Sequence, residues 1–555
     1  DHLEAAPIGF TPAAGNYETA DGDPIEVNAD DGADTADGFP DIGHADNANM
    51  TPTPDGVPGK MQMYLFPDPS WAQDPFLAAN SGDEADVVYH EYTHGMSNRL
   101  VVDAAGNSTL TGIQGYAMGE AWSDWYAFDH LVAGGYQSDT AKPGEVLVGR
   151  YVSNEQNLIR TQPLDCTVGA SADVCPGTEG AGAGGYTYGD FGKIIGFPEP
   201  HADGEIWSQT LWDLRAAVGS TLAESLITRA MELSPANPSF LDMRNSIVMA
   251  DKVVRDGRDQ GKIWKTFAGR GMGWFAADLG GNDITPIEDF STPPRRDASR
   301  TSITGTVTDT DTGTPVAGAT VTFAGHASGF ADSYQATTDT TGKYTITNVL
   351  PGGTYPEVTA TAPGYEPVSR DLPVHQGTNK TDWQLRRDWA ATSGGSTITE
   401  ANGEDYTVIG CGPDAALDGR QSTGWSTDAV YTTDGKIDPR HLTVQLPATI
   451  DISQIAINPT GNCGDDASAS TGDYRLETST DGHTWTTTSE GHFNIDNRNK
   501  MNPLPLTPGT TTQINYLRYT MLSTQTTEEG ITCPDLYAGC YYVDTIEVGV
   551  YGTAH

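Results

Sequence analysis

Basic side chains are scarce in this 555-residue sequence: 30 Lys and Arg stand against 75 Asp and Glu, which gives a formal net charge of −45 at pH 7. So acidic a chain is excluded as a nucleic-acid binder, because affinity for phosphate depends on Lys and Arg. No stretch approaches 18 uninterrupted apolar residues, so no membrane-spanning helix is predicted. The 11 Trp, 23 Tyr and 14 Phe argue against disorder. A folded, exported protein of three or four domains is expected.

Cysteine is also sparse, and none of the six residues has CxxC spacing. They fall in three neighbourhoods: Cys166 with Cys175, Cys411 with Cys463, and Cys533 with Cys540. An even, widely spaced set in a modular chain is typical of disulfide bonds formed in an oxidising compartment. Free buried thiols are the alternative, because cysteine is also a common core residue.

The main chemical signal is an HExxH motif formed by His90, Glu91 and His94. Four residues of α-helix advance the chain by slightly more than one turn, so both histidines point from one face and can hold one metal ion, with Glu91 beside it. Acids in segment 83–88 favour a helix that starts just before the motif. The alternative is a chance match on a surface helix.

A third ligand is available 26 residues after His94, at Glu120. Glu120 and Asp124 share one face of a predicted helix whose buried sides carry Trp and Tyr. Two histidines and a glutamate are a known zinc ligand set that leaves one open position for water. Asp124, one turn on, can accept the second ring N–H of a liganding histidine, although an ordinary surface carboxylate is the alternative.

The stretches 90–100 and 119–124 resemble the fungalysin family of secreted zinc metalloendopeptidases, whose catalytic fold is similar to thermolysin. The resemblance extends to segments 47–50, 61–65, 159–160, 201–207 and 263–268, roughly the first half of the chain. It implies an α+β thermolysin-like (gluzincin) domain, mainly helical in its second lobe. It also implies a zinc ion on His90, His94 and Glu120, with Glu91 as the general base.

The same resemblance implies that His201 stabilises the oxyanion, with a helix-cap histidine as the alternative. Thermolysin has an aspartate five residues before this histidine to orient it, whereas this chain has Gly196. The orienting residue is therefore expected to be Glu199 or Asp203.

Three further residues are implied to bind substrate. Arg160 matches an arginine that holds a substrate carbonyl, with surface solvation as the alternative. Asn47 and Ala48 match the positions that anchor an extended peptide along an edge strand at the upper rim of the cleft. Plain turn residues are the alternative for this pair.

Residues 1–60 hold 13 carboxylates against a single base, Lys60. A solvated acidic surface is favoured over a calcium site in this loop. By resemblance, the family's first β-rich segment and propeptide precede Asp1. An active form is therefore expected to keep an N-terminal piece, either as a cleaved companion fragment or as residues absent from this numbering.

The chain is expected to be multidomain, with a metallopeptidase domain over 1–295 that ends in a Pro-rich linker. Alternating β-branched runs over 300–387 resemble a carboxypeptidase-regulatory-like β-sandwich. Residues 388–555 are similar to discoidin-type, galactose-binding-like β jelly rolls, whose members bind glycans, collagen or cell surfaces. Asp414 and Asp418 could contribute to a calcium site there, although turn chemistry explains them equally well.

These observations predict a secreted, extracellular zinc endopeptidase that acts on protein or peptide substrates and carries two C-terminal β modules. Two alternatives stay open. An HExxH enzyme can be an aminopeptidase, which would need an acidic cluster to capture the α-amine of its substrate. The chain could also be an adhesion or glycan-binding protein whose catalytic half is vestigial.

Overall fold

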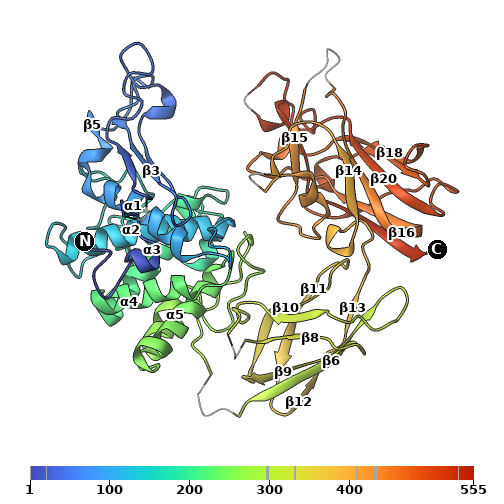
Figure 1. Ribbon diagram of the computed structural model, residues 1–555, viewed down its shortest axis with the longest axis horizontal. Helices are drawn as coiled ribbons and strands as arrows, with labels where there is room; N and C mark the ends of the chain where they lie inside the picture. The colour runs from blue at the N-terminus through green and yellow to red at the C-terminus, as the bar shows by residue number, and fades with distance from the viewer. Residues whose placement is uncertain are drawn as a thin grey trace.

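The computed structural model describes residues 2–20, 22–294, 299–330, 333–407, 410–430, 436–535 and 537–555. Three bodies follow one another along the chain (Figure 1). Each is built around a large hydrophobic core, and these cores lie within residues 8–276, 303–385 and 389–550. The linker residues Arg295 and Arg296 lie outside the described part. No helix of the described part combines the length and the apolar character that crossing a bilayer requires.

A small β-rich lobe opens the first body. Its sheet has the order β1-β3-β2, so β2 is an edge strand, and a separate pair lies beside it. The strands are β1 (Glu26–Asn28), β2 (Ala48–Thr51), β3 (Lys60–Met63), β4 (Leu65–Phe66) and β5 (Ala79–Asn80). Residues 60–66 do not form one continuous strand, because the Tyr64 amide donates to Ser81 Oγ instead of to a strand partner and the strand breaks there.

Buried Arg99 fixes the acidic N-terminal loop against the helix of the HExxH motif. Its guanidinium donates to the carbonyl oxygens of Gly15, Thr53, Pro54 and Val57 and forms an ion pair with Asp23 at 2.7 Å. A charge this deeply buried is stable only when paired and fully hydrogen-bonded. The loop is therefore held against the helix by a specific polar anchor.

Six helices form the rest of the first body: α1 (Ala85–Leu100), α2 (Ile113–Ala133), α3 (Pro200–Val218), α4 (Ser220–Glu232), α5 (Phe240–Arg255) and α6 (Gln260–Gly269). Pro200 occupies the first turn of α3, where a missing N–H costs nothing. Ser239 and Asp242 form a capping box that starts α5. Fully buried Trp122, Trp125 and Trp207 fill the core between α2 and α3.

Gly204 allows α3 to approach α2 closely. A Cβ at this position would lie 2.7 Å from the carbonyl oxygen of Ala117 and 3.3 Å from Glu120 Cβ. Both distances are too short for a side chain without movement of one helix. The glycine thus brings the start of α3, which carries His201, against the turn of α2 that carries Glu120.

The second body is a sandwich of two four-stranded sheets, β11-β10-β7-β8 and β12-β6-β13 with β9 on β6. Burial alternates along β6, as expected for a strand with one face in the core. Its strands are β6 (Thr301–Asp309), β7 (Thr320–Phe323), β8 (Gln335–Thr337), β9 (Lys343–Val349), β10 (Gly353–Thr361), β11 (Val368–Val374), β12 (Thr378–Lys380) and β13 (Trp383–Leu385).

The third body is also all-β. A seven-stranded sheet is built on the 19-residue strand β16, which pairs with β14, β19, β20 and β22, while β15 pairs with β21. Its strands are β14 (Thr397–Ala401), β15 (Trp425–Asp428), β16 (Arg440–Asn458), β17 (Asp473–Ser479), β18 (Thr486–His492), β19 (Asn502–Pro503), β20 (Ile514–Met521), β21 (Tyr542–Thr545) and β22 (Glu547–Ala554).

All six cysteines form disulfide bonds, and the expected pairing is confirmed. Cys166–Cys175 closes a loop of the first body, while Cys411–Cys463 and Cys533–Cys540 close loops of the third body.

Candidate active site

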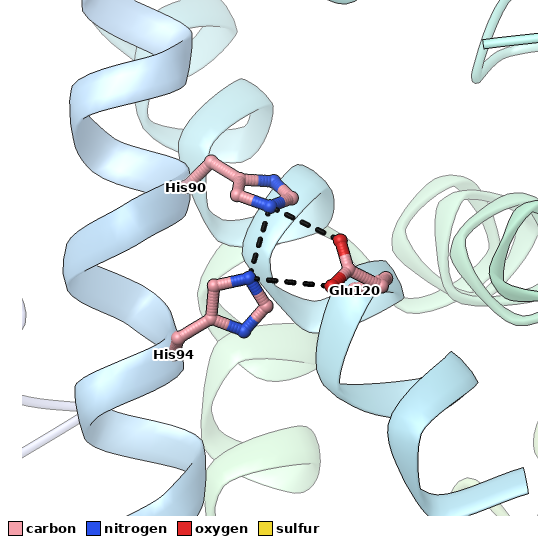
Figure 2. Close-up of side chains that lie close together, drawn as sticks. All are labelled: His90, His94 and Glu120. Atoms are coloured by element: carbon pink, nitrogen blue, oxygen red, sulfur yellow. Dashed lines mark hydrogen bonds and ion pairs between the residues drawn. The ribbon is translucent and has the colours of Figure 1, made fainter. Parts of the chain in front are cut away.

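His90 and His94 lie one turn apart on α1 and face the same side of it (Figure 2). Their Nε2 atoms are 3.1 Å apart. Glu120 of α2 points between them, with Oε2 3.2 Å from His90 Nε2 and Oε1 3.5 Å from His94 Nε2. Within the described ranges, these residues are the one group of three or more His, Cys, Asp or Glu whose ligand atoms all lie within 4.8 Å.

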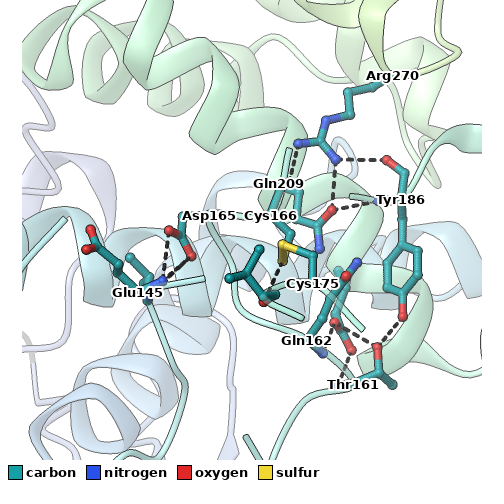
Figure 3. Close-up of a disulfide and its surroundings, with 12 residues drawn as sticks. Glu145, Thr161, Gln162, Asp165, Cys166, Cys175, Tyr186, Gln209 and Arg270 are labelled. Carbon is teal, nitrogen blue, oxygen red and sulfur yellow. Dashed lines mark hydrogen bonds between the residues drawn. A yellow bond between two sulfur atoms is a disulfide. The ribbon is translucent and has the colours of Figure 1, made fainter. Parts of the chain in front are cut away.

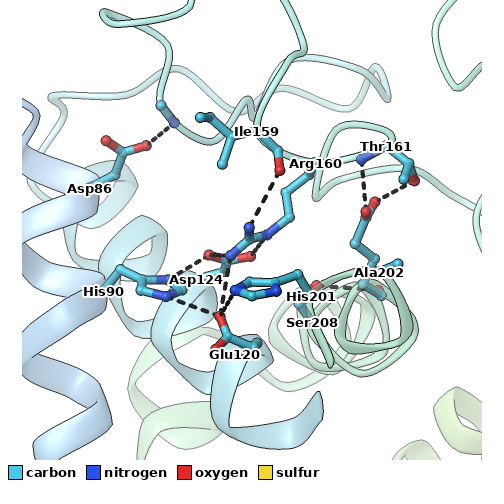
Figure 4. A network of polar contacts seen from close by, with 12 residues as sticks. Asp86, His90, Glu120, Asp124, Ile159, Arg160, Thr161, His201, Ala202 and Ser208 are labelled. Carbon is cyan, nitrogen blue, oxygen red and sulfur yellow. Dashed lines mark hydrogen bonds and ion pairs between the residues drawn. The ribbon is translucent and has the colours of Figure 1, made fainter. Parts of the chain in front are cut away.

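Asp124 fixes the orientation and tautomer of His90. Its Oδ1 is 2.8 Å from His90 Nδ1, so the ring donates its Nδ1 proton and turns the Nε2 lone pair toward Glu120 and His94. Arg160 holds Asp124 in turn through a bidentate pair, Nε to Oδ2 at 2.8 Å and Nη2 to Oδ1 at 3.0 Å (Figure 4). This carboxylate is therefore fixed from both sides.

The charges of the cluster fit a divalent cation. Burial lowers the pKa of His90, but Asp124 and Glu120 outweigh it and raise that pKa to about 10. Burial lowers the pKa of His94 to about 4, which keeps its ring neutral. Glu120 Oε2 is buried and accepts no hydrogen bond from the described residues. Two carboxylates thus attract positive charge to the point where the imidazole lone pairs converge, which suits zinc.

Glu91 follows His90 on α1 and is 6% exposed. Burial raises the pKa of its carboxyl group to about 7, although neighbouring His90 lowers it. A carboxylate with a pKa near neutrality is well matched to accept a proton from water and to return it.

His201 lies at the start of α3, beside the zinc-ligand cluster, and its side chain is 55% exposed. Its Nε2 is 3.4 Å from Glu120 Oε2. Its Nδ1 is 2.6 Å from Glu199 Oε1, and the other Glu199 oxygen caps the helix by accepting from the Ala202 amide. Asp203 instead accepts from the amides of Gly192 and Glu199. Of the two expected orienting residues, Glu199 is the one in contact with the ring.

The Arg160 side chain is only 7% exposed and points toward Glu120 and Asp124 rather than into solvent. Its Nη2 lies 3.6 Å from Glu120 Oε2, besides the pair with Asp124. The segment after it is held by Glu205, a residue of α3 whose contact the sequence did not suggest. The sequence did contain a signal for this contact: Glu205 is an acid one turn after His201, on a stretch of helix whose other residues are buried.

Asn47 and Ala48 lie at the start of the edge strand β2, and no contact joins them to the cluster within the described residues. The Asn47 side chain accepts a hydrogen bond from the Ala48 amide at 2.9 Å, which is turn chemistry. Ala48 packs with Val87 and Tyr92 of α1 through a small core of Tyr17 and three methionines. The strand is thereby docked on the same helix that carries both histidines.

The Cys166–Cys175 loop takes part in a buried polar network (Figure 3). Arg270 is its centre: Nη1 donates to the Tyr186 carbonyl and to Gln209 Oε1, and Nη2 donates to the Cys166 carbonyl. The disulfide loop is therefore tied to α3 and to the end of α6.

The calcium prediction rests on Asp414 and Asp418 in the third body. Asp418 accepts from the Arg420 amide and from Thr423 Oγ1, which are turn contacts. Sequence reasoning missed Glu547, a buried residue whose Oε1 accepts no hydrogen bond within the described ranges and whose Oε2 accepts from the Gly419 amide. A calcium ion at this place remains a prediction.

Comparison with known proteins agrees with this geometry. Residues 4–276 match the family model of the fungalysin metallopeptidases (M36). The first body is a fungalysin metallopeptidase domain. Residues 302–386 match a carboxypeptidase regulatory-like domain, and residues 394–533 match an F5/8 type C domain.

Curated relatives of the fungalysin domain are fungal. An extracellular metalloproteinase 2 of Arthroderma otae is 30% identical over 294 residues, which cover 48% of this chain and 41% of the relative. An extracellular metalloproteinase mep of Aspergillus flavus is 29% identical over 313 residues, covering 51% and 44%. The chain thus spans less than half the length of these relatives.

Solved structures also resemble part of the chain. A CBM32 module from a family 31 glycoside hydrolase of Clostridium perfringens is 23% identical, with a TM-score of 0.22, and the match covers 28% of this chain and 91% of that one. An F5/8 type C domain from Bacteroides fragilis is 13% identical, with a TM-score of 0.22, covering 29% and 93%.

Proposed function

We propose that this protein is a secreted zinc endopeptidase with a thermolysin-like catalytic domain that hydrolyses extracellular proteins. The observation that carries the proposal is the convergence of His90, His94 and Glu120, with Glu91 in the adjacent position on α1. The names of the fungal relatives support extracellular proteolysis. Three protein ligands leave a fourth position for water, as a hydrolytic zinc site requires.

A zinc ion held by these residues would supply a Lewis acid that lowers the pKa of water and polarises the scissile carbonyl. Glu91 takes a proton from the attacking water and passes it to the leaving amine. His201 donates from Nε2 to the oxyanion as charge develops on it. The Glu199 carboxylate contacts Nδ1 and so turns the Nε2 edge of the ring toward the cluster.

Substrate binding is assigned to groups on both sides of the cluster. Arg160 holds a substrate carbonyl with the guanidinium edge that is not used by Asp124. Asn47 and Ala48 present the free edge of β2, where an extended peptide can add as a further strand. The F5/8 type C match supports attachment to glycans through residues 388–555.

Metal analysis together with a casein assay tests the proposal. We expect about one zinc ion per chain, hydrolysis that a chelator abolishes and that added zinc restores, and cleavage of N-terminally blocked peptides. Cleavage restricted to peptides with a free N-terminus would establish an aminopeptidase instead. Glycan binding without any proteolysis by the metal-loaded protein would establish the adhesion alternative.

A further inference from the structure

Glu205 is a buried carboxylate on α3, one turn after His201 and 3% exposed. Three donors converge on it, and all belong to two consecutive residues. The Thr161 amide donates to Oε1 at 2.8 Å, while Thr161 Oγ1 and the Gln162 amide donate to Oε2 at 3.0 and 3.2 Å. Glu205 therefore accepts hydrogen bonds from one short segment of chain.

That segment directly continues the residue that holds Asp124. Arg160 precedes Thr161 and makes two hydrogen bonds to Asp124, which accepts the Nδ1 proton of His90. A continuous set of contacts thus runs from Glu205 through 160–162 to a zinc ligand. The same helix α3 carries His201, so Glu205 also sets the distance between Arg160 and the oxyanion donor.

The other side of the segment is closed by the disulfide-loop network. Thr161 Oγ1 lies 2.5 Å from the Tyr186 hydroxyl, and the Tyr186 carbonyl accepts from Arg270. Burying a carboxylate without a paired charge is unfavourable. A hydrophobic residue at position 205 would fill the space, but it would leave the amides of Thr161 and Gln162 buried without acceptors. Position 205 carries an acid because its two oxygens accept all three hydrogen bonds from Thr161 and Gln162.

Building on the proposed peptidase function, we propose that Glu205 is a positioning residue for the reaction: it fixes segment 160–162 on α3 and thereby sets Arg160 against Asp124 and substrate. Loss of this anchor lets Arg160 drift from Asp124, so the orientation of His90 and the capture of the substrate carbonyl both weaken. Outer partners of this kind typically change metal affinity or activity by about 10- to 100-fold.

The test compares Glu205→Ala and Glu205→Gln with a matched control. Glu224→Gln alters another buried carboxylate, on α4, that makes no contact with 160–162 in the described chain. We expect Glu205→Ala to lower kcat/KM for a short peptide by about 10- to 100-fold and to speed amide exchange at Thr161 and Gln162 in the metal-free protein. Glu205→Gln, which keeps one acceptor oxygen, should be intermediate, and the control should leave both readouts unchanged.

A double-mutant cycle with Arg160→Ala separates positioning from general stability. If Glu205 acts through Arg160, adding Glu205→Ala to Arg160→Ala lowers kcat/KM by less than twofold. Independent, multiplying losses would overturn the inference. The inference would also be overturned if Glu205→Ala kept the kcat/KM and the amide exchange of the parent. If Glu205→Ala does not fold, the same comparison is made with Glu205→Gln. If the parent protein has no peptidase activity, the proposed function is overturned instead. Amide exchange at Thr161 and Gln162 would then still test whether Glu205 holds this segment.

Discussion

At the scale of single residues, Glu91 is the side chain on which the proposed chemistry depends most directly. Glu91→Gln should retain zinc and fold, because the amide keeps the shape of the side chain, but it cannot accept a proton. We expect kcat to fall by about 10²- to 10⁴-fold or more. Steady-state kinetics with metal analysis checks this, and activity within threefold of the parent would exclude Glu91 as the base.

Glu199 offers a second test at this scale, with Asp203 as its neighbour and control. Glu199→Gln removes the carboxylate that orients the His201 ring through Nδ1, so kcat/KM should fall by about tenfold or more. Asp203→Asn alters only contacts to the Gly192 and Glu199 amides.

The measurement is kcat/KM of both variants from pH 5 to 9. A larger loss of kcat/KM in Asp203→Asn than in Glu199→Gln across this range would assign the orienting role to Asp203.

The sequence predicted the convergence of the metal ligands because helical periodicity decides which side chains share a face. Both His90 with His94 and Glu120 with Asp124 follow that rule. Periodicity could not choose between Glu199 and Asp203, since residues at a helix start are placed by capping geometry. It also could not reveal Glu205, whose partners lie more than 40 residues earlier in the chain.

At the scale of helices, the close approach of α2 and α3 depends on Gly204. Gly204→Ala should push α3 away from Ala117 and Glu120, so zinc affinity and kcat/KM should both fall by about tenfold or more. The matched control is Gly261→Ala on α6, where a Cβ meets nothing within 4 Å. Alanine there should raise stability by up to about 1 kcal/mol.

Chelator competition measures the zinc affinity of both variants, peptide kinetics measures kcat/KM, and thermal unfolding measures stability. Unchanged zinc affinity in a folded Gly204→Ala protein would show that the helices tolerate the methyl group.

Local patterns were reliable for the helices and less so for the strands. The segment 240–255 forms α5, and local sequence marks its start with prolines at 235 and 238 and a capping box. Strand limits depend on distant partners: the Ser81 hydroxyl breaks the run at Tyr64, and β16 extends over 19 residues because it serves four other strands. Neither feature has a local signal.

At the scale of the whole molecule, the first and second bodies are joined by buried polar contacts. His326 donates from Nε2 to the Trp274 carbonyl at 2.7 Å, and Arg244 reaches the Gly325 carbonyl. Burial and nearby Arg244 lower the pKa of His326 from its usual value to about 3. Its ring is thus neutral in the folded protein at pH values where it would be charged in an unfolded chain.

The sign of the pH effect follows from this difference. An unfolded chain binds a proton at His326 below pH 6.5, whereas the folded chain does so only near pH 3, so acid favours unfolding between these limits. Relative to His326→Phe, the parent should lose up to about 1.4 kcal/mol of unfolding free energy per pH unit below 6.5. Denaturant unfolding at pH 7, 5.5 and 4.5 measures it; a constant difference between parent and variant would contradict the assignment.

Polar and ring contacts also join the third body to the second: the Gly364 amide donates to Ser393 Oγ, and Arg387 stacks on Trp389. Arg386 donates to Gln454 Oε1, and the Tyr551 hydroxyl contacts Glu366. Asp388 and Trp389 instead bond the backbone of β22 and belong to the core of the third body. Removal of residues 388–555 breaks these contacts but keeps the residues of the second body's own core, which lie within 303–385.

We expect the shortened protein to keep kcat and zinc content within about twofold on a short peptide, since every proposed catalytic and zinc-binding residue lies before position 202. Binding to glycans or insoluble substrate should weaken, because the F5/8 type C region is gone. Pull-down on insoluble substrate beside peptide kinetics separates the two effects. A flexibly attached binding module can change the local concentration of substrate but not the rate of the chemical step. A large loss of kcat in a folded, zinc-loaded fragment would therefore show that the third body is part of the catalytic unit.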